Sequence, residues 1–158
     1  MFAIGDYIAH PMHGAGIIDE VVQKRINGTE RDYYVLKLPV GDMKVMIPVD
    51  GCDNIGVRPV VNAEEARNVI SQFGEIEISL TQNWNKRYRE NMLKIKSGNL
   101  LDLAEVVKGL MCRDVERGLS TGERRMLHSA KQILISELVV ALNTSYESIE
   151  DELTSSLG

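Results

Sequence analysis

The sequence is poor in the residues that build disulfide frameworks, aromatic cores and membrane spans. Its 158 residues include two cysteines, four prolines, two phenylalanines and one tryptophan. Cys52 and Cys112 lie far apart and form no CxxC motif, which leaves neither a disulfide framework nor a zinc ribbon. The longest uninterrupted apolar run is Leu138 to Leu142, whereas a membrane-spanning helix needs about 20 apolar residues. Residues 1–6 show no basic region before an apolar one, so we expect no signal peptide.

What the chain does contain is typical of a soluble, folded protein. Hydrophobic residues make up 44% of the sequence and charged residues 26%, as in globular rather than disordered or fibrous chains. A length of 158 residues suits one large domain or two small ones, and such a chain buries roughly 70% of its unfolded surface. We therefore expect a cytoplasmic protein with a substantial core.

The charges are distributed unevenly, although the formal net charge is only −5. Residues 81–131 carry eleven basic and six acidic side chains. The flanking segments 61–80 and 132–158 have an excess of acidic side chains. A basic block between acidic ones hints at a polyanionic partner such as nucleic acid. The alternative is that these charged side chains simply lie on solvent-exposed helix faces, and the charge distribution by itself favours this alternative.

The first sixty residues show the pattern of short β-strands. β-branched and aromatic residues gather in segments separated by turn residues, namely Tyr7–His10, Ala15–Gln23, Asp32–Leu38, Met43–Ile47 and Ile55–Val60. Asn27-Gly28 is a strong hairpin signal because both residues tolerate the positive φ of a type I′ turn, and Gly41-Asp42 predicts the next hairpin. This arrangement predicts a small SH3-like or Tudor-like β-barrel.

Beyond residue 61 the apolar residues recur at helical spacing. Caps and glycines predict helices from Asn62 to Gly74, from Thr81 or Asn83 to Gly98, from Asn99 to Gly118, from Ser120 to about Leu142, and onward from Thr144. The apolar stripe of the third consists of Leu100, Leu103, Val106, Val107, Leu110 and Met111. We therefore expect an α+β protein with two domains, a β-barrel over residues 1–60 and an all-α helical bundle over 61–158.

No constellation of residues predicts catalysis. His10 and His13 lie beside Pro and Gly, which favours a turn over a metal site because no further ligands are near. Cys52 and Cys112 lack a neighbouring base and are expected to be small buried hydrophobic residues. Gly14-Ala15-Gly16 does not lead into a helix, so it is no phosphate-binding loop. We therefore expect no enzymatic activity, no cofactor and no metal.

The segment Asn83–Asn91 places the single tryptophan beside three cations, Lys86, Arg87 and Arg89. Trp84 falls in the first turn of the predicted helix, and the cations spread over its remaining surface. One interpretation is that Trp84 anchors the core and the cations are solvated. The other is a minor-groove wedge, in which an apolar side chain enters a distorted base step while Lys and Arg neutralise the phosphates. The spacing favours neither.

Further arginines flank the predicted turn around Gly118, namely Arg113, Arg117, Arg124 and Arg125. They extend the basic surface only if they converge with the cations near Trp84, which the sequence does not show. Solvated helix ends are the simpler interpretation for any one of them. In the N-terminal barrel, an open edge strand could pair with a strand of a partner; an ordinary capped edge is the alternative, and nothing local distinguishes the two.

The order and spacing of several motifs resemble those of the CarD/CdnL family of bacterial RNA polymerase-binding transcription regulators, over nearly the whole chain. The motifs are Gly5-Asp6, His10-Pro11-Met12-His13-Gly14, Tyr34-Val35-Leu36-Lys37, Gly56-Val57-Arg58, Asn83-Trp84-Asn85-Lys86-Arg87-Tyr88, Arg117-Gly118-Leu119-Ser120-Thr121-Gly122-Glu123-Arg124-Arg125-Met126-Leu127 and Lys131-Gln132-Ile133-Leu134. The N-terminal part alone also resembles the polymerase-interacting module of transcription-repair coupling factors, but no helicase motif accompanies it. The helical half favours the CarD-like assignment.

The resemblance implies that a Tudor-like N-terminal domain docks on the β1 lobe of the RNA polymerase β subunit, partly through a strand edge. It implies that the helical domain contacts promoter DNA at the upstream edge of the melted −10 region, without reading an operator sequence. In this family, the tryptophan at the position of Trp84 wedges into the minor groove there, and the open promoter complex becomes more stable. The implied backbone contacts are Lys86, Arg89, Arg113 and Arg124, with Arg87 as a further candidate.

Two positions on the implied docking surface depart from the family pattern. One family arginine aligns with Lys24, or with its neighbour Arg25, and a second aligns with Met46, which puts the strength of docking in doubt. A protein of net charge −5 with a few phosphate contacts binds free DNA weakly. Tethering to polymerase, at an effective concentration of about a millimolar, suits it better than independent repression. We expect a monomer without membrane contact; the alternative is an adaptor that captures a partner strand and binds no DNA.

Overall fold

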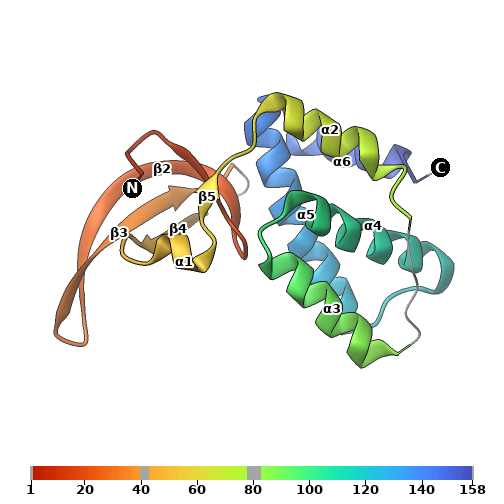
Figure 1. Cartoon of the computed structure of the whole chain (residues 1–158), viewed down its shortest axis with the longest axis horizontal. Coiled ribbons are helices and arrows are strands. Elements are labelled where there is room, and N and C mark those ends of the chain that lie inside the picture. Colours follow the sequence, from red (N-terminus) through yellow and green to blue (C-terminus); the bar gives the residue numbers. More distant parts are fainter. Residues whose placement is uncertain (1, 40–42, 78–82, 158) are drawn as a thin grey trace.

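The computed structural model describes residues 2–39, 43–77 and 83–157, apart from the side chains of Asp53 and Trp84. Its N-terminal part is an antiparallel sheet with the strand order β4-β3-β2-β1-β5. The strands are β1 (Tyr7–His10), β2 (Gly14–Ile26), β3 (Thr29–Lys37), β4 (Lys44–Pro48) and β5 (Arg58–Pro59), and a helical turn, α1 (Cys52–Ile55), precedes β5. The helices are α2 (Ala63–Phe73), α3 (Trp84–Lys96), α4 (Leu100–Arg117), α5 (Thr121–Leu142) and α6 (Tyr146–Ser155). The predicted α+β class is confirmed, and Figure 1 shows the sheet and the helices as two lobes.

The observed strands differ from the predicted ones mainly at their ends. Asn27 and Gly28 have φ angles of 53° and 79°, which confirms the type I′ turn. The prediction of a strand over 55–60 is wrong for most of that segment, because a helical turn occupies its start and only Arg58–Pro59 pairs with β1. The glycines on either side of this turn, Gly51 and Gly56, both take a positive φ that favours glycine. The predicted hairpin at Gly41-Asp42 lies outside the described residues.

The helices begin where their cap residues predict, with one exception. The backbone N–H three residues after the cap donates to the cap side chain at 2.8–3.2 Å for Asn62, Asn83, Asn99 and Ser120. The last helix begins one residue later than predicted, because its cap is Ser145 and not Thr144. The N–H of Thr144 donates to Val139 O behind the left-handed Asn143, so Thr144 completes the end of α5.

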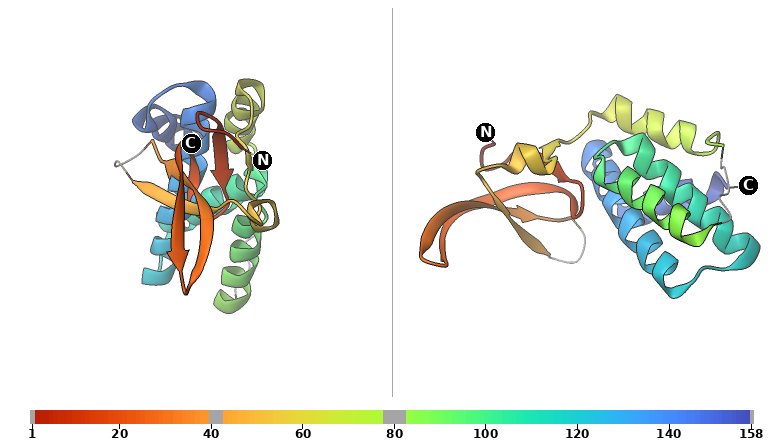
Figure 2. Two further views of the ribbon diagram at one scale, coloured as in Figure 1. Left: turned by 90° about the vertical axis from the view of Figure 1, so that its left-hand side faces the viewer. Right: turned by 60° about the horizontal axis from the view of Figure 1, so that its bottom comes forward.

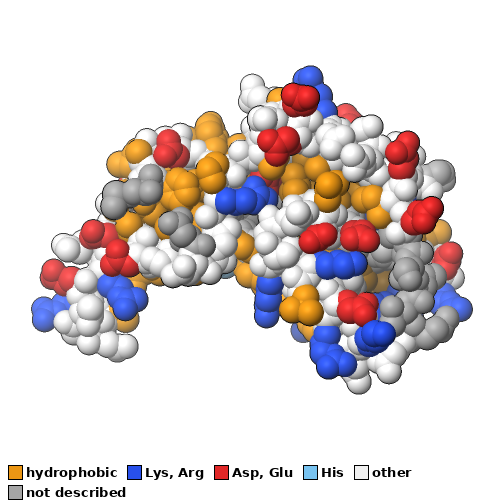
Figure 3. Space-filling model, viewed as in Figure 1, with side chains coloured by type: hydrophobic (Ala, Val, Ile, Leu, Met, Phe, Trp, Pro, Cys, Tyr) orange, Lys and Arg blue, Asp and Glu red, His pale blue; other side chains and the backbone are white. Residues whose placement is uncertain are grey.

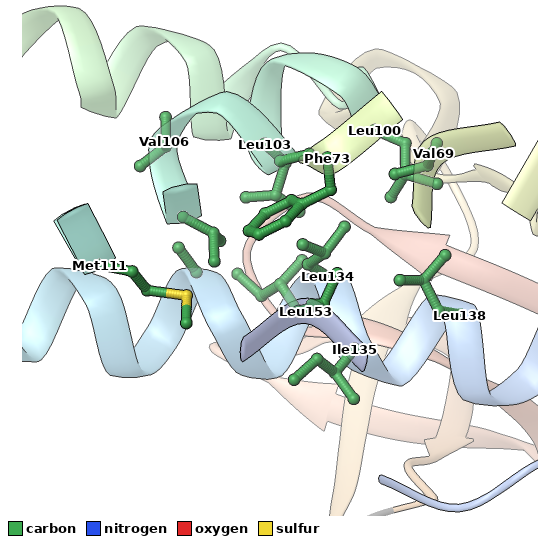
Figure 4. Close-up of a cluster of buried hydrophobic side chains, with 14 of the residues drawn as sticks. Val69, Phe73, Leu100, Leu103, Val106, Met111, Leu134, Ile135, Leu138 and Leu153 are labelled. Atoms are coloured by element: carbon green, nitrogen blue, oxygen red, sulfur yellow. The ribbon is translucent and has the colours of Figure 1, made fainter. Parts of the chain in front are cut away.

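Helix α5 runs through the core of the helical lobe. Leu134 and Leu138 of α5 are fully buried, and Figure 4 shows them among side chains that include Phe73 of α2 and Leu153 of α6. The predicted apolar stripe of α4 is buried along its whole length. Each such side chain contributes roughly 1.5–3 kcal/mol by leaving water. No helix within the described ranges is long and apolar enough to cross a membrane.

Helix α5 also carries the contacts that join the helices to the sheet. The Ala15 N–H donates to Ser136 Oγ at 2.9 Å, and both carboxylate oxygens of Glu137 accept from Arg58, at 2.6 and 2.9 Å. Gly14 permits this close approach, because its φ is +96° and a Cβ there would overlap Ser136 Oγ. We call the contact between Arg58 and Glu137 the junction pair. The two further views in Figure 2 also show the C-terminal part of α5 next to the sheet.

Candidate nucleic-acid interface

Three helix ends meet at the end of the helical lobe that lies away from the sheet (Figure 1). They are the start of α3, the end of α4 and the start of α5, and the carboxylate of Glu123 joins them. Arg87 of α3 donates to it through Nε at 2.9 Å and through Nη2 at 3.2 Å. Arg113 of α4 places its Nε 3.7 Å from Glu123 Oε1, and Ser120 Oγ donates to the same oxygen at 3.3 Å. We call Arg87, Arg113, Ser120 and Glu123 the Glu123 clasp.

Glu123, at the centre of the clasp, is buried but keeps its carboxylate in the charged form. Glu123 is only 4% exposed. Burial alone raises the pKa of this carboxyl group, but the hydrogen bonds and charge of Arg87, together with the charge of Arg113, outweigh it and bring the pKa below its ordinary value. Because two guanidinium groups face one carboxylate, the clasp keeps a net positive charge.

Arg87 does not lie on the surface, so the prediction that it fans out among the solvated cations is wrong. It is 8% exposed, and its guanidinium pairs with Glu123. A charged group this deeply buried requires an anionic partner inside the protein. Arg87 therefore ties the first turn of α3 to α5, and its guanidinium is already engaged there.

The other predicted DNA contacts lie at the same end of the lobe. Lys86, Arg89 and Arg124 are exposed, whereas Arg113 keeps 22% of its side chain exposed. Trp84 is the first residue of α3, and its side chain lies outside the described part of the chain. The structure thus brings cations from three helices, far apart in sequence, to one end. Figure 3 shows Lys and Arg side chains along the lower edge of the helical lobe.

The predicted docking residues all lie on the sheet, but not at one point. Met46 is 42% exposed on the edge strand β4 and pairs with Val35, which in turn pairs with Glu20 of β2. Lys24 follows Glu20 by four residues, about 13 Å along the strand, in the part of the β2–β3 hairpin that extends beyond β4. Since side chains alternate between faces, Lys24 shares the face of Met46 and Arg25 lies on the opposite one. Of these two neighbours, only Lys24 therefore lies on the same face as Met46.

The histidine pair forms a tight turn, as predicted. His10 is 9% exposed, and its Nδ1 accepts from the Met12 N–H at 3.0 Å, while its ring centre lies 4.5 Å from that of His13. Burial first, and the neighbouring His13 second, lower the pKa of His10 to about 4. Cys52 is buried as expected, but Cys112 is only half-buried. Among the described residues, no group of three His, Cys, Asp or Glu side chains is placed to hold a metal ion.

Comparison with known proteins assigns both lobes to one family. A family model described as "CarD, C-terminal domain" matches residues 68–154, and one described as "CarD-like/TRCF RID domain" matches residues 2–61. The chain belongs to the CarD family. It is similar to the Bacillus subtilis (strain 168) protein named "Putative transcription factor YdeB", with 39% identity over 140 residues. The matched region makes up 89% of this chain and 92% of that protein.

Membership in the CarD family confirms the resemblance found in the sequence and supports transcription regulation as the functional class. The family model that covers the sheet, "CarD-like/TRCF RID domain", is shared with the polymerase-interacting module of transcription-repair coupling factors. It suggests an interaction with RNA polymerase. The domain boundary between residues 60 and 61 stays a prediction, as do the individual contact residues.

Sequence reasoning missed the two buried carboxylates that organise this CarD-family structure. Glu123 follows the cap residue Ser120 by three positions, a spacing that indicates a capping box, and no motif singles out Glu137. The position of Glu137 within the apolar stretch 133–142 could have indicated a buried ion pair, because a carboxylate buried there needs a cation. The identity of that cation is hidden, since Arg87 and Arg58 lie 36 and 79 residues away from their partners in the sequence.

Proposed function

We propose that this protein regulates transcription by docking its sheet on RNA polymerase and placing the clasp end of its helical lobe on promoter DNA. The observation that carries the proposal is the meeting of three helix ends around Glu123, with Trp84 at the start of α3 and exposed cations on α3 and α5. Contact at the upstream edge of the melted −10 region then stabilises the open complex.

The proposed DNA contact combines a wedge with phosphate neutralisation. Trp84 enters the minor groove at a distorted base step, where stacking on a base is worth about 1–3 kcal/mol. Lys86, Arg89 and Arg124, which are exposed, contact the flanking phosphates, and Arg113 contributes through its exposed portion. We leave Arg87 out of the phosphate contacts because its guanidinium is engaged with Glu123. A few such contacts carry no base specificity.

The proposed polymerase contact uses the face of the sheet that holds Lys24 and Met46, together with the edge of β4. An edge strand presents unpaired N–H and C=O groups, to which a strand of the β subunit's β1 lobe can add. The tether compensates for the weak DNA contact, since a formal net charge of −5 opposes binding to free DNA.

The test is the lifetime of open complexes formed by the cognate polymerase on a weak promoter. We expect the wild-type protein to lengthen this lifetime and Trp84→Ala to shorten it by about tenfold relative to wild type, which corresponds to ~1.4 kcal/mol. Leu93→Ala is the matched control, because it removes a 70% exposed apolar side chain from the same helix. If Trp84→Ala binds polymerase normally and leaves the lifetime unchanged, the wedge is wrong and the adaptor that binds no DNA becomes the better hypothesis.

A further inference from the structure

The Glu123 carboxylate makes more contacts than a helix cap requires. In a capping box, the glutamate side chain returns to the backbone at the start of its own helix. Here the Glu123 N–H donates to Ser120 Oγ at 3.2 Å, which already satisfies the cap, and the carboxylate accepts from Arg87 at 2.9 and 3.2 Å. Both carboxylate oxygens of Glu123 therefore bind a side chain of α3, in addition to the role of this residue at the start of α5.

The position of Arg87 in α3 gives this contact its consequence. Arg87 lies three residues after Trp84, which is nearly one helical turn, and its N–H donates to the carbonyl of the cap residue Asn83 at 3.0 Å. A restraint on the Arg87 guanidinium is therefore a restraint on the first turn of α3, where Trp84 and Lys86 are placed. Arg113 of α4 lies beside the same carboxylate, with its Nε 3.7 Å from Glu123 Oε1, so its positive charge adds to that of Arg87 there.

We propose that Glu123 is a positioning residue for the DNA contact: it holds the first turn of α3 so that Trp84 and Lys86 meet DNA together. This inference rests on the proposed function of the clasp end. Glu123 is 4% exposed and does not itself touch DNA. Its effect passes through Arg87 to the backbone that carries the wedge.

The chain offers a matched control for a purely structural role. Glu137 lies on the same helix, is 2% exposed, and binds one arginine through both oxygens, but it does so at the sheet. Glu123→Gln and Glu137→Gln therefore remove the same charge from equally buried sites on one helix. If Glu123 only supports the fold, the two variants will behave alike. If it positions α3, only Glu123→Gln will act on Trp84.

The first arm of the test is a double-mutant cycle on open-complex lifetime, with variants compared at equal folded fraction and equal polymerase binding. We expect Glu123→Gln to shorten the lifetime by about threefold or more, and to have a clearly smaller effect when Trp84 is already Ala, because only the Lys86 contact is then left to position. Additive effects of Glu123→Gln and Trp84→Ala would overturn the proposal, because Glu123 would then act independently of the wedge. If Glu123→Gln does not fold, Glu123→Asp retains the charge, withdraws the carboxylate by one methylene and answers the same question.

The second arm reads Trp84 directly in the full chain, without polymerase or DNA. Trp84 is the single tryptophan, so fluorescence anisotropy and acrylamide quenching report on its position alone. We expect Glu123→Gln to lower the anisotropy and raise the quenching, and Glu137→Gln to change neither. Equal changes in both variants would overturn the positioning role. A change confined to Glu123→Gln, combined with no effect of Trp84→Ala on open-complex lifetime, would leave the positioning role standing while the proposed wedge function fails.

Discussion

The two ends of helix α5 solve the same electrostatic problem with different numbers of charges. At one end Glu137 is 2% exposed and faces a single arginine, Arg58, with the Val61 N–H as a further donor at 3.0 Å. At the other end Glu123 is 4% exposed and faces two arginines, Arg87 and Arg113. The junction pair is electrically balanced, whereas the Glu123 clasp carries one positive charge in excess.

The difference suits the position of each site. A balanced pair has no net charge, so its field falls off over a short distance, and the junction pair mainly fixes the helices to the sheet. An excess of positive charge at the clasp adds to the exposed cations Lys86, Arg89 and Arg124, at the end proposed to meet phosphates. Burial thus has two uses on one helix, to hold two lobes together and to orient a charged surface.

The largest effect is expected from removing the single arginine of the junction pair. Arg58→Met leaves the Glu137 carboxylate buried with one backbone donor, a change that typically costs ~3–5 kcal/mol. Arg87→Met is expected to cost less, about 1–3 kcal/mol, because Glu123 keeps Arg113 and Ser120. Urea unfolding of both variants measures the difference. Equal losses would show that the second arginine of the clasp gives Glu123 no compensation.

The junction end is also expected to respond to mild acid. His10, which lines a small cavity with Arg58 and Glu137, has its pKa lowered to about 4 from 6.5. Because the unfolded chain takes up this proton first, the stability from neutral His10 is fully present above about pH 6.5 and is lost as the pH falls to about 4. The loss amounts to about 3 kcal/mol. Unfolding between pH 7 and 4 should show this slope in wild type and not in His10→Asn; an unchanged slope in the variant would assign it to other groups.

Two glycines with similar φ angles allow the cost of backbone strain to be measured separately from the cost of a steric clash, because only Gly14 lies where the sheet approaches α5. Gly14→Ala meets both a φ of +96° and Ser136 Oγ, whereas Gly5→Ala meets a φ of +94° with no atom within 4 Å. We expect about 1–2 kcal/mol of destabilisation from the backbone alone at Gly5, and about 1–3 kcal/mol more at Gly14 from overpacking. Thermal unfolding of the two variants gives the difference. Similar values would mean that α5 moves away from β2 without cost.

At the clasp end the expected pH dependence lies in a lower range. The pKa of Glu123 is below its ordinary value of 4.5, so its stabilising contribution is present above about pH 4.5 and is lost as the pH falls through the lowered value. The difference in unfolding free energy between wild type and Glu123→Gln should therefore stay constant from pH 7 to 5 and shrink below it. A difference that shrinks already near pH 6 would contradict this assignment.

The sequence predicted local features well, because each depends on neighbouring residues. Asn27-Gly28 requires only two residues that tolerate a positive φ, and Asn99 caps α4 by bonding within its own first turn. The prediction of the fifth strand is wrong because it rested on the β-branched residues of 55–60, which favour extended backbone. The helical turn between Gly51 and Gly56 occupies the start of that segment instead. Which strand such a segment joins is set by pairing partners elsewhere.

The candidate site shows the limit of sequence reasoning more clearly. The segment around Trp84 indicates the cations at the start of α3, but nothing in its spacing shows that Arg87 is buried while Lys86 and Arg89 are exposed. Only the fold, by placing Glu123 beside it, divides one buried arginine from its exposed neighbours. Composition registers the number of charges in a segment, but pairing over long sequence distances decides which of them are free to meet a partner.

The smallest effect is expected midway between the two ends of α5, where an ion pair lies near the surface. Lys131 Nζ is 2.8 Å from Glu150 of α6, and the two side chains are 23% and 38% exposed. Water and salt screen such a pair, and ordering its long side chains offsets most of the attraction, so Lys131→Met should change stability by only about 0.5 kcal/mol or less. The same unfolding measurement as for Arg58→Met tests this. A loss as large as that of Arg58→Met would mean that ion pairing along α5, rather than burial, sets the strength of its contacts, and the contrast between its two ends would lose its physical basis.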